Sequence, residues 1–149
     1  MQNKFITKGR EETIRLASNI GKNLKGGEIF TITSDLGGGK TTFTKGLVLG
    51  SGSKDNVTSP SFNIKNEYKN GKFNIYHYDF YRLNNDPGLM KNELDEAINE
   101  KDAVIILEWS ESVRNILPAD IIEIDIKVND ENIRQFSFNF PPKYTYLFN

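Results

Sequence analysis

Residues 31–42 constrain this chain more than any other stretch, and they read Thr-Ile-Thr-Ser-Asp-Leu-Gly-Gly-Gly-Lys-Thr-Thr. An apolar run at 29–32 leads into them, and an amphipathic run that begins at Phe43 follows them. A strand, a glycine-rich turn and a helix opening at a Lys-Thr pair are typical of a phosphate-binding loop. The pattern therefore predicts a polyphosphate site, and a glycine-rich turn without a ligand is the simpler alternative.

Each residue type in this loop has a physical reason. Gly37, Gly38 and Gly39 let the backbone N–H groups come close to one phosphate chain. The following helix adds partial positive charge at its start. Lys40 is expected to reach the β- and γ-phosphates, and the Thr41 hydroxyl is expected to bind Mg²⁺. Ser34 stands where the motif has its first glycine, which costs energy if φ is positive there.

Composition narrows the class of protein. The chain has 149 residues, enough for one domain with a substantial core, so we expect a single domain over 1–149 with a tail at about 141–149. The net charge of −1 gives no global basic character of the kind that binds DNA non-specifically. The absence of cysteine excludes disulfides, thiolate catalysis and Cys-based zinc sites. No apolar run approaches the ~20 residues of a membrane span, so we expect a soluble cytoplasmic protein.

Periodicity predicts alternating helices and strands. The continuous apolar run at 103–107 is typical of a strand buried on both faces of a parallel sheet. Asn70-Gly71 between two aromatic-rich runs predicts a hairpin. The expected helices are Thr7–Leu24 with Thr7 as N-cap, 40–49, 86–99 and a short one closed at 117–118; the expected strands are 28–33, 63–68, 73–78, 103–108, 122–128 and 133–140. The tail either docks through its aromatic side chains or stays loose.

Two acids end predicted strands. Glu108 follows the apolar run, where P-loop proteins hold Mg²⁺ or its water, and a salt bridge to a nearby lysine is the structural alternative. Asp79 either orients a water near the phosphates or pairs with Arg82. Trp109, the only tryptophan, either packs in the core or contacts a partner or substrate. His77, the only histidine, has the spacing of a structural strand residue.

The segment Thr58-Ser59-Pro60-Ser61 is rich in hydroxyl groups and is fixed by a proline. A segment of this kind just after a P-loop helix is either a switch loop that senses the γ-phosphate or a plain surface connector. The residues alone leave both readings open.

Taken together, five segments in this order and spacing closely resemble the TsaE (formerly YjeE) family, the bacterial P-loop ATPases of tRNA threonylcarbamoyladenosine synthesis. The resemblance runs from about Thr13 to Arg134 and rests on these segments: Ser34-Asp-Leu-Gly-Gly-Gly-Lys-Thr-Thr-Phe, Thr58-Ser-Pro-Ser-Phe, His77-Tyr-Asp-Phe-Tyr-Arg-Leu, Leu107-Glu-Trp-Ser-Glu and Leu117-Pro.

The resemblance implies an α/β fold of P-loop NTPase type, with a mixed sheet that has a parallel core, antiparallel hairpins and helices on both faces. It implies ATP and Mg²⁺ as cofactors and TsaD and TsaB as partners, with tRNA met only through that complex. The complex installs the threonylcarbamoyl group on adenosine 37 of tRNAs that read ANN codons. TsaE supplies nucleotide-driven turnover.

Residue roles implied by the resemblance follow position by position. Residues Gly37 to Thr42 would cradle the phosphates. Thr41 and Glu108 would hold Mg²⁺. Asp79 and Trp109 would be required for function, and 58–62 would be switch-like. Arg134 matches an arginine near the nucleotide base, and Thr13 lies on the same side. The chain departs from the family pattern at Ser34 (usually glycine), Gly38 (usually alanine) and Ser61 (commonly threonine), and we expect Gly38 only to loosen the loop.

The reaction expected first is Mg²⁺-dependent ATP hydrolysis, with Lys40 offsetting charge on the γ-phosphate and Asp79 or Glu108 as candidate bases. No arginine finger is obvious, although Arg82 and Arg114 are candidates, so slow hydrolysis that partners accelerate is expected. A nucleotide-dependent interaction module is the second hypothesis. A small-molecule kinase is the third, but no arginine-rich lid segment stands out.

Overall fold

The computed structural model describes residues 1–35, 37–60, 64–81 and 88–149, except for the side chains of residues 89 and 90. The elements in chain order are β1 (Gln2–Lys8), α1 (Arg10–Gly21), β2 (Ile29–Ser34), α2 (Lys40–Gly50), β3 (Lys65–Lys69), β4 (Asn74–Asp79), α3 (Gly88–Asn99), β5 (Val104–Glu108), the 3₁₀ helix η2 (Ser110–Ile116), β6 (Ile122–Asp130), β7 (Ile133–Asn139) and the 3₁₀ helix η3 (Pro142–Phe148).

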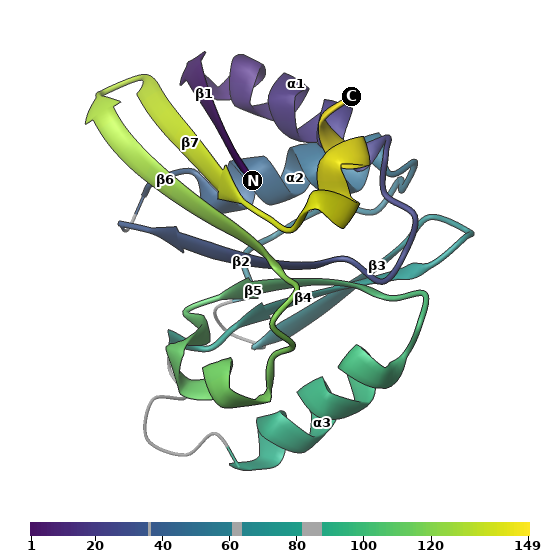
Figure 1. Ribbon diagram of the computed structural model, residues 1–149. Coiled ribbons are helices and arrows are strands. Elements are labelled where there is room, and N and C mark those ends of the chain that lie inside the picture. The colour runs from purple at the N-terminus through teal and green to yellow at the C-terminus, as the bar shows by residue number, and fades with distance from the viewer. Residues whose placement is uncertain (36, 61–63, 82–87) are drawn as a thin grey trace.

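All the described strands belong to one sheet of seven, in the order β1-β7-β6-β2-β5-β4-β3 (Figure 1). The pairs β6–β2, β2–β5 and β5–β4 are parallel, and the pairs β1–β7, β7–β6 and β4–β3 are antiparallel. The predicted mixed sheet with a parallel core and antiparallel hairpins is confirmed. In a parallel core the carboxyl ends of the strands meet at one edge, which is where such folds bind ligands.

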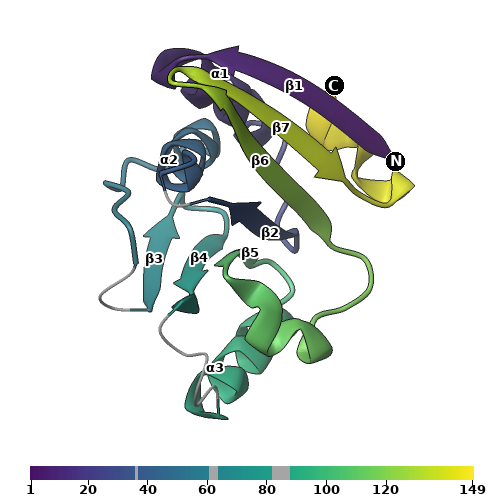
Figure 2. The same cartoon turned by 90° about the vertical axis from the view of Figure 1, so that its left-hand side faces the viewer.

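Helices cover both faces of this sheet. On one face α1, α2 and η3 pack over a core that includes Phe30, Ile32 and Phe43, and on the other α3 and η2 cover a core that includes Tyr78 and Leu107 (Figures 1 and 2). Strand β5 contributes to both cores in alternation and is buried along its whole length. This explains why its sequence is continuously apolar, since both faces of the strand are covered.

The predicted amino-terminal boundary of the first helix was wrong. Thr7 is not an N-cap but belongs to β1, and α1 begins at Arg10 after Gly9. Residues 2–8 form an edge strand because they pair with β7, with Phe5 opposite Phe136 and its ring 5.8 Å from that of Phe138. A pairing between segments this far apart in the chain leaves no local periodic signal.

The C-terminal segment docks rather than staying loose. Tyr144 and Leu147 of η3 are buried against the α1–α2 core. The Tyr146 hydroxyl donates a hydrogen bond to Oε1 of the buried Glu28, at 2.7 Å. The predicted start of α3 at 86–87 lies outside the described residues. Within the described part of the chain, none of the helices has the length and apolar character needed to cross a membrane.

Candidate functional site

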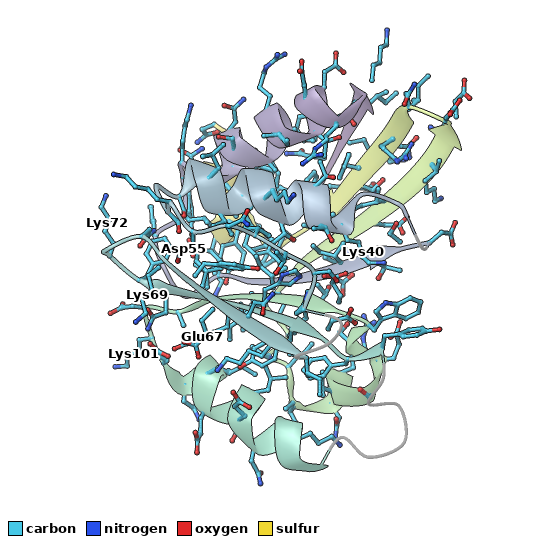
Figure 3. The ribbon with its side chains drawn as sticks, turned by 180° about the vertical axis from the view of Figure 1, so that it is seen from behind. Lys40, Asp55, Glu67, Lys69, Lys72 and Lys101 are labelled. Carbon is cyan, nitrogen blue, oxygen red and sulfur yellow. The ribbon has the colours of Figure 1, made fainter. Side chains whose placement is uncertain are left out.

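The glycine-rich loop joins the carboxyl end of β2 to the start of α2. Gly37 and Gly39 have φ of 77° and 102°, a left-handed conformation that glycine adopts without a steric penalty. Gly39 precedes the first residue of α2, Lys40, which Figure 3 shows at the start of that helix. The N–H groups of the first turn have no partner within the helix, so they can bind an anion there.

Two carboxylates lie beside this loop. Asp79 and Glu108 are the last residues of β4 and β5 and are register partners, and Glu108 is also the register partner of Ile32 in β2. Their exposed fractions are only 7% and 3%. The parallel register therefore brings two buried acids to the sheet edge from which the loop departs.

The loop and the acids enclose a cavity of about 370 Å³. Its lining residues come from the loop, the first turn of α2 and the ends of β4 and β5: Gly37, Gly38, Gly39, Lys40, Thr41, Thr42, Ser59, Asp79, Tyr81, Glu108 and Trp109. A second cavity of about 350 Å³, on the face of β6, β7 and β1 away from α1 and α2, is similar in volume but is not lined by this loop. The chemistry of the lining, not its size, selects the first cavity.

Among the described residues Glu108 has no lysine partner, which was the structural alternative considered above. Its partner is His77, whose Nε2 lies 2.5 Å from Glu108 Oε2, and both side chains are buried. Alternation along β4 places His77 on the same face as Asp79, two residues later. The sequence interpretation missed this contact, because it depends on β4 and β5 being neighbours in the sheet.

Asp79 is held by backbone contacts on both of its sides. Its Oδ1 accepts a hydrogen bond from the Tyr81 N–H at 3.0 Å, and its own N–H donates to the Ile64 carbonyl at 2.8 Å. The suggested partner Arg82 lies outside the described residues. These contacts fix Asp79 at the wall of the cavity and connect it to Ile64, the residue before β3.

Trp109 combines core packing with a place on the cavity wall. It packs against the α3-side core and lines the cavity, and its backbone has φ 56°, a conformation that non-glycine residues rarely adopt. The Tyr81 ring lies 4.8 Å from the Trp109 ring, and Lys40 Nζ lies 5.3 Å from the Trp109 ring centre. Tyr81 was not identified from sequence.

The hydroxyl-rich segment reaches the cavity through Ser59. The Thr58 carbonyl accepts hydrogen bonds from Asn66 Nδ2 at 3.1 Å and from the Tyr68 hydroxyl at 3.2 Å, and Pro60 is buried. Ser61 lies outside the described residues. The segment is thus attached to β3 on one side and faces the glycine-rich loop on the other.

Thr13 and Arg134 lie on the far side of the loop, around a smaller cavity of about 190 Å³ that shares Gly37, Gly39 and Thr42 with the first. The Thr13 hydroxyl is hydrogen-bonded to the Thr7 hydroxyl at 2.8 Å. Arg134 Nη1 donates to the carbonyls of the β6–β7 turn. Arg10, Glu131 and Asn132 also line this cavity, and sequence reasoning had not identified them.

The oxygen donors of the cavity fit a magnesium ion that is also bound by phosphate oxygens. No group of three or more His, Cys, Asp or Glu side chains that could hold a metal ion occurs among the described residues. The cavity instead offers the Thr41 hydroxyl and the carboxylates of Glu108 and Asp79. Mg²⁺ usually takes one or two carboxylates and completes its octahedron with phosphate oxygens and water, so this sparse set is sufficient.

Comparison with known proteins gives consistent matches over most of the chain. The family model described as "Threonylcarbamoyl adenosine biosynthesis protein TsaE" matches residues 7–136. Proteins named tRNA threonylcarbamoyladenosine biosynthesis protein TsaE are 37% identical in Rickettsia prowazekii (93% of this chain, 94% of the relative) and 36% identical in Bacillus subtilis (92% and 85%). The crystal structure of Bacillus subtilis YdiB superposes with a TM-score of 0.79 at 33% identity, covering 99% of this chain and 91% of that one.

Proposed function

Because this chain belongs to the TsaE family of threonylcarbamoyl adenosine biosynthesis proteins, we propose that it is the ATP-binding and ATP-hydrolysing subunit of that pathway. In this proposal it acts with TsaD and TsaB in the cytoplasm to support threonylcarbamoylation of adenosine 37 in tRNAs that read ANN codons. The observation that carries the proposal is the cavity in which Lys40 and the loop face Asp79 and Glu108.

The loop would bind the phosphates of ATP. The N–H groups of residues 37–42 are directed by the left-handed glycines and by the start of α2, where the helix dipole favours negative charge. Lys40 would leave the Trp109 ring to offset charge on the β- and γ-phosphates. Thr13 and Arg134, which line the cavity on the other side of the loop, would contact the nucleoside.

Thr41 and Glu108 would hold Mg²⁺, which when bound neutralises charge on the phosphates. In hydrolysis a water oxygen forms a bond to the γ-phosphorus as the bond from that phosphorus to the β–γ bridging oxygen breaks. The electron pair stays on the ADP oxygen, and a proton of the water passes to the Asp79 or Glu108 carboxylate. Both line the cavity, and Asp79 is the stronger candidate because Glu108 would also hold Mg²⁺.

An arginine that reaches the phosphate cavity accelerates many related reactions. Within the described part of the chain no arginine lines it, and Arg114 instead lines the cavity on the other face of the sheet and pairs with Glu123 at 3.1 Å. An arginine supplied in trans typically contributes about 10³–10⁵ in rate. We therefore expect slow hydrolysis by the isolated protein and faster turnover with TsaD and TsaB.

The test measures ATP hydrolysis and tRNA modification with and without TsaD and TsaB from the same organism. Wild type should hydrolyse ATP faster with the partners, Lys40→Ala should lose ATP binding, and Glu108→Gln should bind ATP without turning it over. Equal rates with and without the partners would refute the coupling. If Glu108→Gln still supports tRNA modification, ATP binding alone does the work. The chain is then a nucleotide-dependent switch, a reading that the position of Ser59 beside the loop favours.

A further inference from the structure

His77 forms a buried pair with Glu108, and the proposed reaction gives His77 no role. Nε2 of His77 lies 2.5 Å from Oε2 of Glu108, and the exposed fractions of the two side chains are 0% and 4%. The residues lie on adjacent parallel strands, with Asp79 as the register partner of Glu108. His77 is the only histidine of the chain.

The surroundings leave the imidazole one described polar partner. Its Nδ1 is buried without a hydrogen bond to the described residues, and its ring packs near the Tyr68 ring at 6.4 Å. Here the ring is directed at one carboxylate oxygen.

The two oxygens of the Glu108 carboxylate have different surroundings. Oε2 is engaged by His77, while Oε1 makes no hydrogen bond to the described residues and the side chain lines the cavity. A buried carboxylate needs a hydrogen-bond donor, so we assign the imidazole proton to Nε2. A ring locked in a core cannot swing, so it also fixes the plane of the carboxylate.

We propose that His77 is the positioning residue for Glu108: its Nε2–H holds Oε2 and thereby keeps Oε1 directed at the phosphate cavity, where it serves Mg²⁺. The inference rests on the function proposed above. Hydrogen-bonded partners of metal-binding carboxylates orient them, and their removal typically costs about 10–100-fold in metal affinity or activity.

Two variants separate positioning from packing. His77→Gln keeps an N–H donor at a similar reach, whereas His77→Phe keeps a ring beside Tyr68 and removes the donor. We expect His77→Phe to raise the Mg²⁺ concentration for half-maximal ATP hydrolysis by at least about tenfold. ATP affinity measured in EDTA should stay within about threefold, because Lys40 and the loop are untouched. His77→Gln should restore most of the Mg²⁺ response.

A second measurement needs no nucleotide and begins with the wild-type protein. The side-chain ¹⁵N spectrum of the wild type contains one imidazole, which should carry its proton on Nε2, with the proton signal shifted downfield by the hydrogen bond to Glu108. That shift should disappear in Glu108→Ala. An imidazole protonated only on Nδ1 would overturn the proposal.

The remaining outcomes are also decisive. An unchanged Mg²⁺ requirement in His77→Phe, or an equal loss in His77→Gln and His77→Phe, would overturn the positioning role while wild-type hydrolysis left the proposed function standing. A wild-type protein without Mg²⁺-dependent ATP binding or hydrolysis would instead refute the proposed function, and this proposal with it.

Discussion

The Ser34 side chain occupies the space that a side chain on residue 38 would need. A Cβ atom built on Gly38 would lie 1.6 Å from Ser34 Oγ, which itself donates a hydrogen bond to the Asp35 carbonyl at 3.0 Å. The two departures from the family pattern that we expect in this loop are therefore complementary. The sequence analysis expected Gly38 only to loosen the loop. In the structure Gly38 also leaves room for the Ser34 side chain.

The first prediction is a coupling between these positions. Gly38→Ala should weaken ATP binding by roughly tenfold, because overpacking of this kind costs about 1–3 kcal/mol. Ser34→Gly should leave binding intact or improve it. In the Ser34→Gly background the alanine should cost less, although a contact of 2.9 Å with the Asp35 carbonyl remains. Calorimetric titration of the four proteins measures the coupling, and an equal cost of Gly38→Ala in both backgrounds would contradict it.

The second prediction concerns the docked C-terminal segment. The buried carboxylate of Glu28 accepts hydrogen bonds from the N–H groups of Lys25 and Gly26 and from the Tyr146 hydroxyl. Tyr146→Phe should lower the free energy of unfolding by about 1.5–3 kcal/mol, the usual range for a bond to a charged group. Urea unfolding measures this change.

The matched control is Tyr144→Phe in the same segment. The Tyr144 hydroxyl donates to the backbone carbonyl of Asp120, which carries no charge, at 3.3 Å. This contact is longer and weaker. Its loss should cost no more than about 1 kcal/mol. ATP affinity should be unchanged in both variants, because Glu28 lies at the opposite end of β2 from the loop. Equal destabilisation by the two variants would show that Glu28 contributes no specific bond.

The third prediction is an alkaline loss of stability. Burial raises the pKa of Tyr78 to about 12, from an ordinary value of 10.0. The unfolded chain therefore releases this proton first, so the contribution of Tyr78 is complete below pH 10 and is lost as the pH rises towards 12. At pH 11 the loss should be about 1.4 kcal/mol relative to pH 8. Tyr78→Phe should flatten this part of the pH profile, and an unchanged slope would contradict the assignment.

The parts of the fold that could be predicted are those with local signals. The continuous apolar run of β5, the Asn70-Gly71 hairpin and the glycine-rich turn each reflect the backbone geometry of a few residues. Strand β1 was missed because its stability comes from β7, which lies more than a hundred residues away in the chain. An edge strand with mixed side chains has no period that distinguishes it from a helix start.

For the site, strand ends were predictable and side-chain partners were not. Asp79 and Glu108 were identified because each ends an apolar or aromatic strand, and the parallel register makes them neighbours. The partner of Glu108 could not be identified without knowing that β4 is adjacent to β5, a choice that the sheet makes through packing. Thr13 and Arg134 share a cavity for the same reason, since β1 and β7 bring their segments together.

The most direct measurement for the account as a whole is calorimetric titration of Mg²⁺-ATP into wild type, Lys40→Ala and Lys72→Ala. Lys72 is the control because it is exposed in the β3–β4 turn, at the end of the molecule away from Lys40 (Figure 3). Wild type and Lys72→Ala should bind one ATP with affinities within about twofold of each other, while Lys40→Ala should lose at least about tenfold. Binding by Lys40→Ala equal to that of wild type would place the nucleotide elsewhere and contradict the account.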